Sequence, residues 1–402
     1  MNMKKMRFLS LAMAAAMSLS LLAGCGGGTA KQPESSSPAG SASAAFKLGG
    51  TGPLTGGAAI YGNAAKNGAQ IAVDEINAAG GAIQFELKYE DDTHDAEKAV
   101  NAYNALKDWG MQISLGSVTS KPCEATSSDT FDDRIFALTP SASSTAVLEG
   151  KDNMYQMCFV DPNQGSASAQ YIFDKKLGTK IGIIYKNDDV YSMGITDTFK
   201  SKAAELGLEV VSEGAFADGN DTDFSVQLNE AKSAGADLIF LPMYYTPASL
   251  ILSQAKAMNY APKFFGVDGM DGILTVKNFD TSLAEGVMLL TPFNADSTDE
   301  KTQNFVKTYQ DKFGEIPNQF AADAYDCVYA YAAALEKAGC TPDMSAQDIC
   351  EKLVETFPTY DGHEGVTLDG LTGEGMTWDQ TGAVSKAPKG MVIENGGYVG
   401  MD

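Results

Sequence analysis

From Phe46 onward, short apolar runs alternate with longer segments whose apolar residues recur at helical spacing. The first such helix is expected over residues 61–79, where alanine repeats along one face and Gly80-Gly81 ends the pattern. Further strands are expected at 46–50, 85–89, 111–115 and 134–138, with a helix at 96–109. Four strand–helix units in a row predict a parallel sheet with helices on both faces.

A second series of the same kind begins at residue 178 and is about as long as the first. Its expected strands are 178–185, 208–214, 237–241 and 263–267, and its expected helices are 191–206, 224–234 and 247–258. Helical patterns return at 301–313, 321–338 and 346–357, before a turn-rich C-terminus. Ligands of open α/β sheets bind outside the carboxyl ends of the strands, so the candidate site is a cleft lined by strand-end loops of both halves.

The N-terminal segment predicts export. Lys4, Lys5 and Arg7 precede an apolar run over residues 8–22, which is short for a membrane span. The run ends in Leu22-Ala23-Gly24-Cys25, which resembles a bacterial lipobox, so residues 1–24 are expected to be removed and Cys25 lipidated. A plain signal peptide with an incidental cysteine is the alternative. Residues 25–45 are rich in Gly, Ser, Ala and Pro and are expected to form a flexible tether, making the lipid the only membrane anchor.

The net charge limits which kinds of binding partner are expected, and the cysteine content limits which disulfides are expected. The chain has 402 residues, enough for two domains, with 52 acidic and 29 basic residues. Removal of the three basic residues of the signal leaves 26 against 52, a net charge near −26, which argues against nucleic acid and anionic lipid as partners. Six cysteines in a chain of this length are not a disulfide scaffold, although a Cys340–Cys350 bridge stays open.

The residues offer little for catalysis or metal binding. Of the two histidines, neither His94 nor His363 stands at a metal-ligand spacing, and no nucleophile elbow or phosphate-binding glycine loop is present. The acidic residues 218–223 depart from a calcium-loop pattern and are interpreted as a surface turn. Residues 90–92 are interpreted as a solvated acidic loop rather than as paired catalytic acids. We therefore expect no enzyme, no cofactor and no metal site.

Two stretches at residues 115–122 and 138–144 are rich in serine and threonine, and each follows an expected buried strand and precedes a helix-like segment. Such residues are ordinary helix N-caps. Hydroxyls and free backbone N–H groups at a helix start also hold a carboxylate without a basic side chain. Asp268 ends the strand at 263–267 and could take an ammonium group, with tyrosine rings around it, so the cleft suits a zwitterion.

A set of motifs resembles one protein family. The motifs are Gly52-Pro53-Leu54-Thr55-Gly56, Tyr61-Gly62, Asn67-Gly68-Ala69, Asp74-Glu75-Ile76-Asn77-Ala78-Ala79-Gly80-Gly81, Asp161-Pro162-Asn163-Gln164-Gly165, Asp188-Asp189-Val190-Tyr191-Ser192-Met193-Gly194 and Gly370-Leu371-Thr372-Gly373. In this order they resemble the leucine/isoleucine/valine-type periplasmic binding proteins, the substrate receptors of ABC transporters. The resemblance implies the type I fold: two doubly wound parallel-sheet lobes joined by a three-segment hinge, here 46–160 plus 292–387 and 161–291 plus 388–402.

The resemblance also implies the roles of individual residues. Ser117 and Ser143, with backbone groups of Ser141 and with Ala142 beside them, match the positions that bind the ligand's α-carboxylate. Asp268 matches the acid that binds the α-ammonium. Three tyrosines match positions that line the side-chain pocket, namely Tyr61, Tyr191 and Tyr244. Phe320 is a further candidate for this pocket. The chain departs from relatives that carry a disulfide near the first sheet, because His94 and Gly116 stand at those positions.

These observations predict a monomeric receptor that closes on an amino acid, branched-chain or otherwise apolar, and delivers it to the permease and ATPase subunits of an ABC importer. Two alternatives stay open: a receptor for another small molecule, such as an amide or an aromatic acid, and a sensor that passes its ligand state to a signalling partner.

Overall fold

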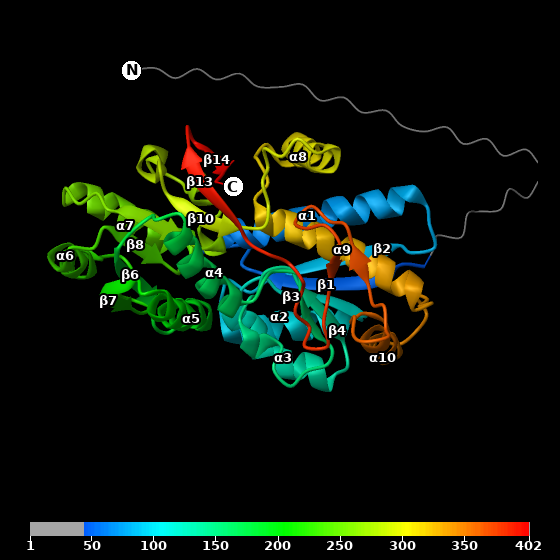
Figure 1. The fold of residues 1–402 in the computed structure, drawn as a ribbon. Coiled ribbons are helices and arrows are strands. Elements are labelled where there is room, and N and C mark those ends of the chain that lie inside the picture. Colours follow the sequence, from blue (N-terminus) through cyan, green and yellow to red (C-terminus); the bar gives the residue numbers. More distant parts are fainter. Residues whose placement is uncertain (1–43, 402) are drawn as a thin grey trace, which may run out of the picture. The chain divides into compact units, whose positions relative to one another are not determined.

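The computed structural model describes residues 44–401 (Figure 1). The predicted signal peptide, the predicted lipidation at Cys25 and all but the end of the tether lie outside these residues. Within residues 44–401, none of the helices combines the length and the apolar character that crossing a membrane requires.

The first sheet has five strands in the order β2-β1-β3-β4-β5, and all of them are parallel. Its strands are β1 (Phe46–Gly52), β2 (Phe85–Asp91), β3 (Ile113–Ser117), β4 (Phe136–Thr139) and β5 (Met154–Gln156). The crossovers are α1 (Ala59–Ala79), α2 (Ala96–Trp109) and α3 (Ser120–Asp132). This confirms the predicted parallel α/β sheet, because parallel strands need such helical crossovers.

The second sheet repeats this strand order and adds a hairpin, giving β14-β13-β10-β9-β8-β6-β7. Its parallel strands are β6 (Lys180–Lys186), β7 (Glu209–Phe216), β8 (Leu238–Leu241), β9 (Lys263–Gly266) and β10 (Met288–Thr291). The hairpin strands β13 (Lys389–Glu394) and β14 (Gly397–Gly400) are antiparallel. The helices of this part are α4 (Asp161–Asp174), α5 (Val190–Leu206), α6 (Ser225–Ala234) and α7 (Tyr245–Ala257).

Three later helices return to the first half of the chain: α8 (Glu300–Phe313) contacts α1, whereas α9 (Gln319–Lys337) and α10 (Ala346–Thr356) contact β4. The long helices α1 and α9 pack side by side (Figure 1). Glycine permits this close approach, because a Cβ atom on Gly68 would lie 1.9 Å from the carbonyl oxygen of Ala321. In the same N-terminal part of α9, Lys386 Nζ and Asp323 Oδ1 form a buried ion pair of 2.7 Å, which ties the segment before β13 to this helix.

The structure adds elements that the sequence patterns missed and corrects others. The short strands β5 and β10 and the helix α4 were not predicted. The segment after the second serine-rich stretch is a single 3₁₀ turn, η1 (Thr145–Val147), so the prediction of a helix-like segment there is wrong. All five cysteines in the described part of the chain are buried and free, so Cys340 and Cys350 do not form a bridge.

Candidate functional site

The candidate site lies where the strand order reverses in each sheet. In the first sheet this switch falls between β1 and β3, and in the second between β6 and β8. Loops at the carboxyl ends of such strands diverge and leave room for a ligand. Each of the four strand ends carries residues that the sequence singled out: the motif that begins at Gly52 at the end of β1, Ser117 at the end of β3, the segment before Tyr191 after β6, and Tyr244 after β8.

Asp268 sits in a cluster of tyrosines. It lies in the 3₁₀ turn η2 (Asp268–Met270) after β9 and is almost completely buried. Its Oδ1 accepts a hydrogen bond of 2.6 Å from the Tyr191 hydroxyl, and the Tyr191 ring stacks on Tyr244 with centroids 4.8 Å apart. The Tyr61 hydroxyl donates to the carbonyl oxygen of Gly269, and the Tyr61 and Tyr244 rings meet edge to face. The structure therefore brings together all four residues that were predicted for the ammonium and side-chain parts of the site.

Burial controls the charge of Asp268. It raises the pKa of the carboxyl to about 7, while the hydrogen bond from the Tyr191 hydroxyl opposes the rise. Burial also raises the pKa of Tyr191 and of Tyr244 well above its usual value, so both phenols are neutral donors at physiological pH. A cation placed beside Asp268 would favour the ionised carboxylate and lower its pKa again.

The predicted carboxylate-binding serines lie at the ends of β3 and β4. The hydroxyl of Ser117 bonds to Thr51 Oγ1 at 2.6 Å, and the hydroxyl of Ser141 donates to the carbonyl oxygen of Val118 at 2.6 Å. Ser143 is fully buried, and its Oγ has no hydrogen-bond partner among the residues that the structure describes. Ala142 lies between Ser141 and Ser143 and is also fully buried. Ser143 is thus the hydroxyl of this group that is left to receive a ligand.

Ordinary capping explains only part of the two serine-rich stretches. Ser144 caps the 3₁₀ turn η1 by accepting from the Ala146 N–H at 3.3 Å. Thr119 precedes α3 as its N-cap residue, but its side chain makes no capping hydrogen bond and instead contacts His94 Nδ1 at 2.9 Å. The first-turn N–H groups of α3 are therefore not capped by a side chain at Thr119.

Two residues at the start of α4 join the two parts of the site, and the sequence analysis did not assign them to it. The Asp161 N–H donates to the carbonyl oxygen of Ser143 at 2.9 Å, and Gln164 Oε1 accepts from the Asp268 N–H at 3.3 Å. Within residues 44–401, neither carboxylate oxygen of Asp161 nor Gln164 Nε2 has a hydrogen-bond partner. Burial raises the pKa of Asp161, and the nearby Asp268 contributes to the rise. The signal that could have found them is Pro162, which marks a helix start.

Direct contacts connect the loops of the two sheets. Thr246 Oγ1 donates to the carbonyl oxygen of Gly57 at 2.7 Å, and the Ile60 N–H donates to the Tyr245 hydroxyl at 3.2 Å. His94 Nε2 lies 3.7 Å from Asp189 Oδ2. The first and last of these contacts border a small cavity of about 180 Å³, which Tyr191 and Tyr244 also line. The loops of the two sheets are therefore drawn together.

The acidic residues 90–92, at the end of β2, correct one interpretation. Asp92 is completely buried and its Oδ1 accepts from the His94 N–H at 2.9 Å, so the segment 90–92 is not a solvated loop. Burial raises the pKa of Asp92 to about 6. Asp218, by contrast, is exposed and pairs with Lys186 at 2.5 Å, as a surface turn would. No group of three or more potential metal ligands occurs in the described part of the chain.

Comparison with known sequences identifies relatives. A family model described as periplasmic binding protein matches residues 45–392. The leucine-, isoleucine-, valine-, threonine- and alanine-binding protein of Pseudomonas aeruginosa is 27% identical over 325 residues, which are 80% of this chain and 85% of that protein. A Leu/Ile/Val-binding protein homolog of Brucella melitensis is 27% identical over 354 residues, 86% of this chain and 91% of that protein.

Solved structures show the same fold. The branched-chain amino acid transporter substrate-binding protein LivJ of Streptococcus pneumoniae, in complex with isoleucine, is 28% identical, covers 88% of this chain and 97% of its own, and has a TM-score of 0.78. A solute-binding protein of an ABC transporter from R. palustris, in complex with benzoate, has a TM-score of 0.77 at 18% identity, with coverages of 89% and 95%. The second likeness concerns the fold alone.

Proposed function

The chain belongs to the periplasmic binding protein family, and on that premise we propose that it is the substrate-binding protein of an ABC importer and captures an amino acid between its two sheets. The observation that carries this proposal is the placement of Asp268. A buried carboxylate needs a counter-charge, and among residues 44–401 the hydrogen bonds to the Asp268 side chain come from neutral donors, led by the Tyr191 hydroxyl. The α-ammonium of an amino acid would supply that charge.

The other end of an amino acid would meet the serine-rich strand ends. The unpartnered hydroxyl of Ser143 and the uncapped first turn of α3 offer donors for an α-carboxylate, with Ser117, Ser141 and Ala142 around them. Tyr61, Tyr191 and Tyr244 would surround the side chain. This wall of aromatic rings favours an apolar side chain, in line with the branched-chain amino acids named for the relatives.

We further propose that the two sheets are the cores of two lobes, 46–160 plus 292–387 and 161–291 plus 388–402, which close by a hinge motion. Membership of the sheets supports this division, because β1–β5 fall in the first lobe and β6–β10 with the hairpin β13–β14 in the second. A ligand that contacts both lobes would shift the population toward the closed form.

The remaining parts of the proposal concern location and partners. Membership of the family implies a place outside the cytoplasm. The lipobox-like sequence ending at Cys25 supports a lipid anchor on the outer face of the cytoplasmic membrane, and the tether would let a monomeric receptor reach the permease, which works with ATPase subunits.

A thermal-shift screen of the mature chain against the common amino acids tests this function. A ligand at 100 times its Kd adds roughly 2.7 kcal/mol of stability, which gives a clear rise in melting temperature. We expect an apolar amino acid to produce this rise and its desamino acid to fail. A rise with benzoate or an amide, together with none from any amino acid, would contradict the proposal in favour of another small-molecule ligand.

A further inference from the structure

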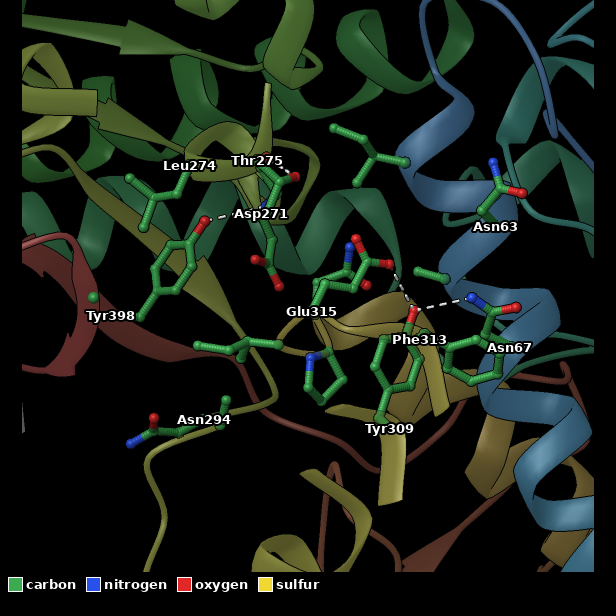
Figure 2. A pocket seen from close by; sticks show the side chains of 18 of the residues that line it. Asn63, Asn67, Asp271, Leu274, Thr275, Asn294, Tyr309, Phe313, Glu315 and Tyr398 are labelled. Atoms are coloured by element: carbon green, nitrogen blue, oxygen red, sulfur yellow. Dashed lines mark hydrogen bonds between the residues drawn. The ribbon is translucent and has the colours of Figure 1, made fainter. Parts of the chain in front are cut away.

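A second, larger cavity lies outside the cleft, between α1 and the β13–β14 hairpin. Its volume is about 740 Å³, which is within the range of small-molecule sites. Figure 2 shows Asn63 and Asn67 of α1 on one side of it and Tyr398 of β14 on the other. None of the residues assigned to the amino-acid site lines this cavity; at the start of α1, Ile60 lines it while Tyr61 belongs to the cleft.

The charges around this α1–β14 cavity have one sign. Three carboxylates line it, from Asp271, Asp296 and Glu315. None of its described lining residues is a lysine, an arginine or a histidine. Asp296 and Glu315 are exposed, whereas Asp271 is almost completely buried. A ligand that enters here meets negative charge and no compensating positive side chain.

The buried carboxylate is held in a fixed position. Asp271 Oδ2 accepts a hydrogen bond of 2.8 Å from the backbone N–H of Gln319, at the start of α9. The side chain of Gln319 in turn donates to the carbonyl oxygen of Asp268 at 2.6 Å. Burial raises the pKa of Asp271 to about 6, so this group is mostly ionised at pH 8.

Aromatic and polar groups complete the lining. The rings of Tyr309, Phe313 and Tyr398 all border the cavity, as Figure 2 shows. The Tyr309 hydroxyl lies between Asn67 Nδ2 and Glu315 Oε1, 3.4 Å from each. Aromatic faces attract cations through their quadrupole, and carboxylates attract them by charge. An apolar body would cover Phe313 and Ile316, which are 37% and 59% exposed and are among the most exposed large hydrophobic residues described.

We propose that the α1–β14 cavity is a second binding site, which takes a small organic cation: an ammonium group on an apolar or aromatic body. The ammonium group lies among Asp271, Asp296 and Glu315, and the apolar body lies against Phe313 and the tyrosine rings. None of the residues that line this site is assigned to the amino-acid cleft.

Calorimetric titration of the mature chain with 2-phenylethylammonium at pH 8 tests this site. The neutral 2-phenylethanol and the anionic 3-phenylpropionate serve as matched ligands of similar size. We expect saturable binding of the cation alone. Equal binding of either matched ligand, or no binding of the cation, would overturn the proposal.

Substitution of the two exposed carboxylates tests whether the cation binds in this cavity. The double variant Asp296→Asn/Glu315→Gln should weaken cation binding by about tenfold, because it removes two of the three carboxylates that attract the cation and exposed charges contribute modestly. The control double variant Asp361→Asn/Glu364→Gln removes two exposed acids that do not line the cavity and should bind as the unmodified chain does. Equal weakening in both doubles would mean general charge attraction and would overturn the site.

The variant Asp268→Ala separates this cavity from the cleft. It should keep its affinity for 2-phenylethylammonium whether or not the unmodified chain binds any amino acid. Loss of cation binding in Asp268→Ala, with full binding in Asp296→Asn/Glu315→Gln, would place the cation in the cleft and overturn the proposal. Failure of the amino-acid screen alone would leave the second site standing.

Discussion

At the scale of single residues, the chemistry of the proposed site depends on a carboxyl group that the fold has taken out of water. Asp268 accepts a hydrogen bond from the Tyr191 hydroxyl, and no lysine, arginine or histidine in the described part of the chain forms an ion pair with it. Burial of the group raises its pKa to about 7. Without a ligand, the native chain therefore holds a proton on Asp268 at pH values where the unfolded chain has lost it, and this contribution to stability falls as pH rises from about 4 to about 7.

This shift predicts a pH dependence of binding. An α-ammonium group pairs with the ionised carboxylate, so binding must release the proton that Asp268 holds below about pH 7. We expect affinity for the amino acid to fall as pH is lowered from 8 to 6. Calorimetry in two buffers with different ionisation enthalpies would report the released proton directly. Binding at pH 6 without proton release would show that Asp268 is not the ammonium partner.

At the scale of elements, two glycines allow α1 to pack closely against its neighbours. Adding a Cβ atom at Gly68 would bring it within 1.9 Å of a backbone oxygen of α9, and at Gly62 within 2.1 Å of the carbonyl oxygen of Pro53. Backbone atoms have no alternative rotamer, so such a clash can be relieved only by moving the helix. The same helix carries Tyr61 into the cleft and Ile60 into the α1–β14 cavity.

The substitution Gly68→Ala should therefore destabilise the fold. We expect a loss of roughly 1–3 kcal/mol in the free energy of unfolding, the usual range for overpacking. Urea denaturation followed by circular dichroism measures it. Gly81→Ala is the control, because a Cβ atom there would meet no heavy atom within 4 Å. Equal stability of the two variants would contradict the close packing of α1 on α9.

Strong periodicity explains which elements could be predicted. The repeated alanines of α1 and the apolar run of β6 specify their elements locally, and the ordered motifs indicated the family that the match over residues 45–392 confirms. The missed elements are short or polar. β5 has three residues, β10 has four, and α4 begins Asp-Pro-Asn-Gln-Gly, so its helical pattern is weak.

The residues of the candidate site also fall into those that could be predicted from the sequence and those that could not. Asp268, Tyr191 and Tyr244 could be grouped because each follows a recognisable strand, and parallel strands end at one edge. Asp161 and Gln164 could not, because their helix was not predicted and their role depends on contacts with Ser143 and Asp268 far away in the chain. Asp92 was misjudged because three consecutive acids suggest solvent, whereas its burial is set by tertiary packing.

At the scale of the whole molecule, the proposed function requires movement between the two sheets. The contacts of Thr246 with Gly57, of Tyr61 with Gly269 and of Gln319 with Asp268 are among the hydrogen bonds that connect the two proposed lobes. Each such hydrogen bond contributes only about 1 kcal/mol net, whereas a bridging ligand would add its contacts to the closed form alone. The free chain should therefore populate open forms.

Small-angle X-ray scattering should detect the closure. We expect the radius of gyration of the mature chain to decrease when the amino acid found in the screen is added. The variant Asp268→Ala, given the same amino acid at the same concentration, should show no decrease. An unchanged radius of gyration in the unmodified chain at saturation would contradict hinge closure.

Calorimetric titration of the unmodified chain and of Asp268→Ala with that amino acid at pH 8 tests the central proposal most directly. Removing one partner of a buried charge pair costs on the order of 3–5 kcal/mol, so the account predicts a Kd raised by at least about a hundredfold in the variant. A Kd that is the same in both proteins would contradict the proposal that Asp268 holds the ammonium group of a bound amino acid.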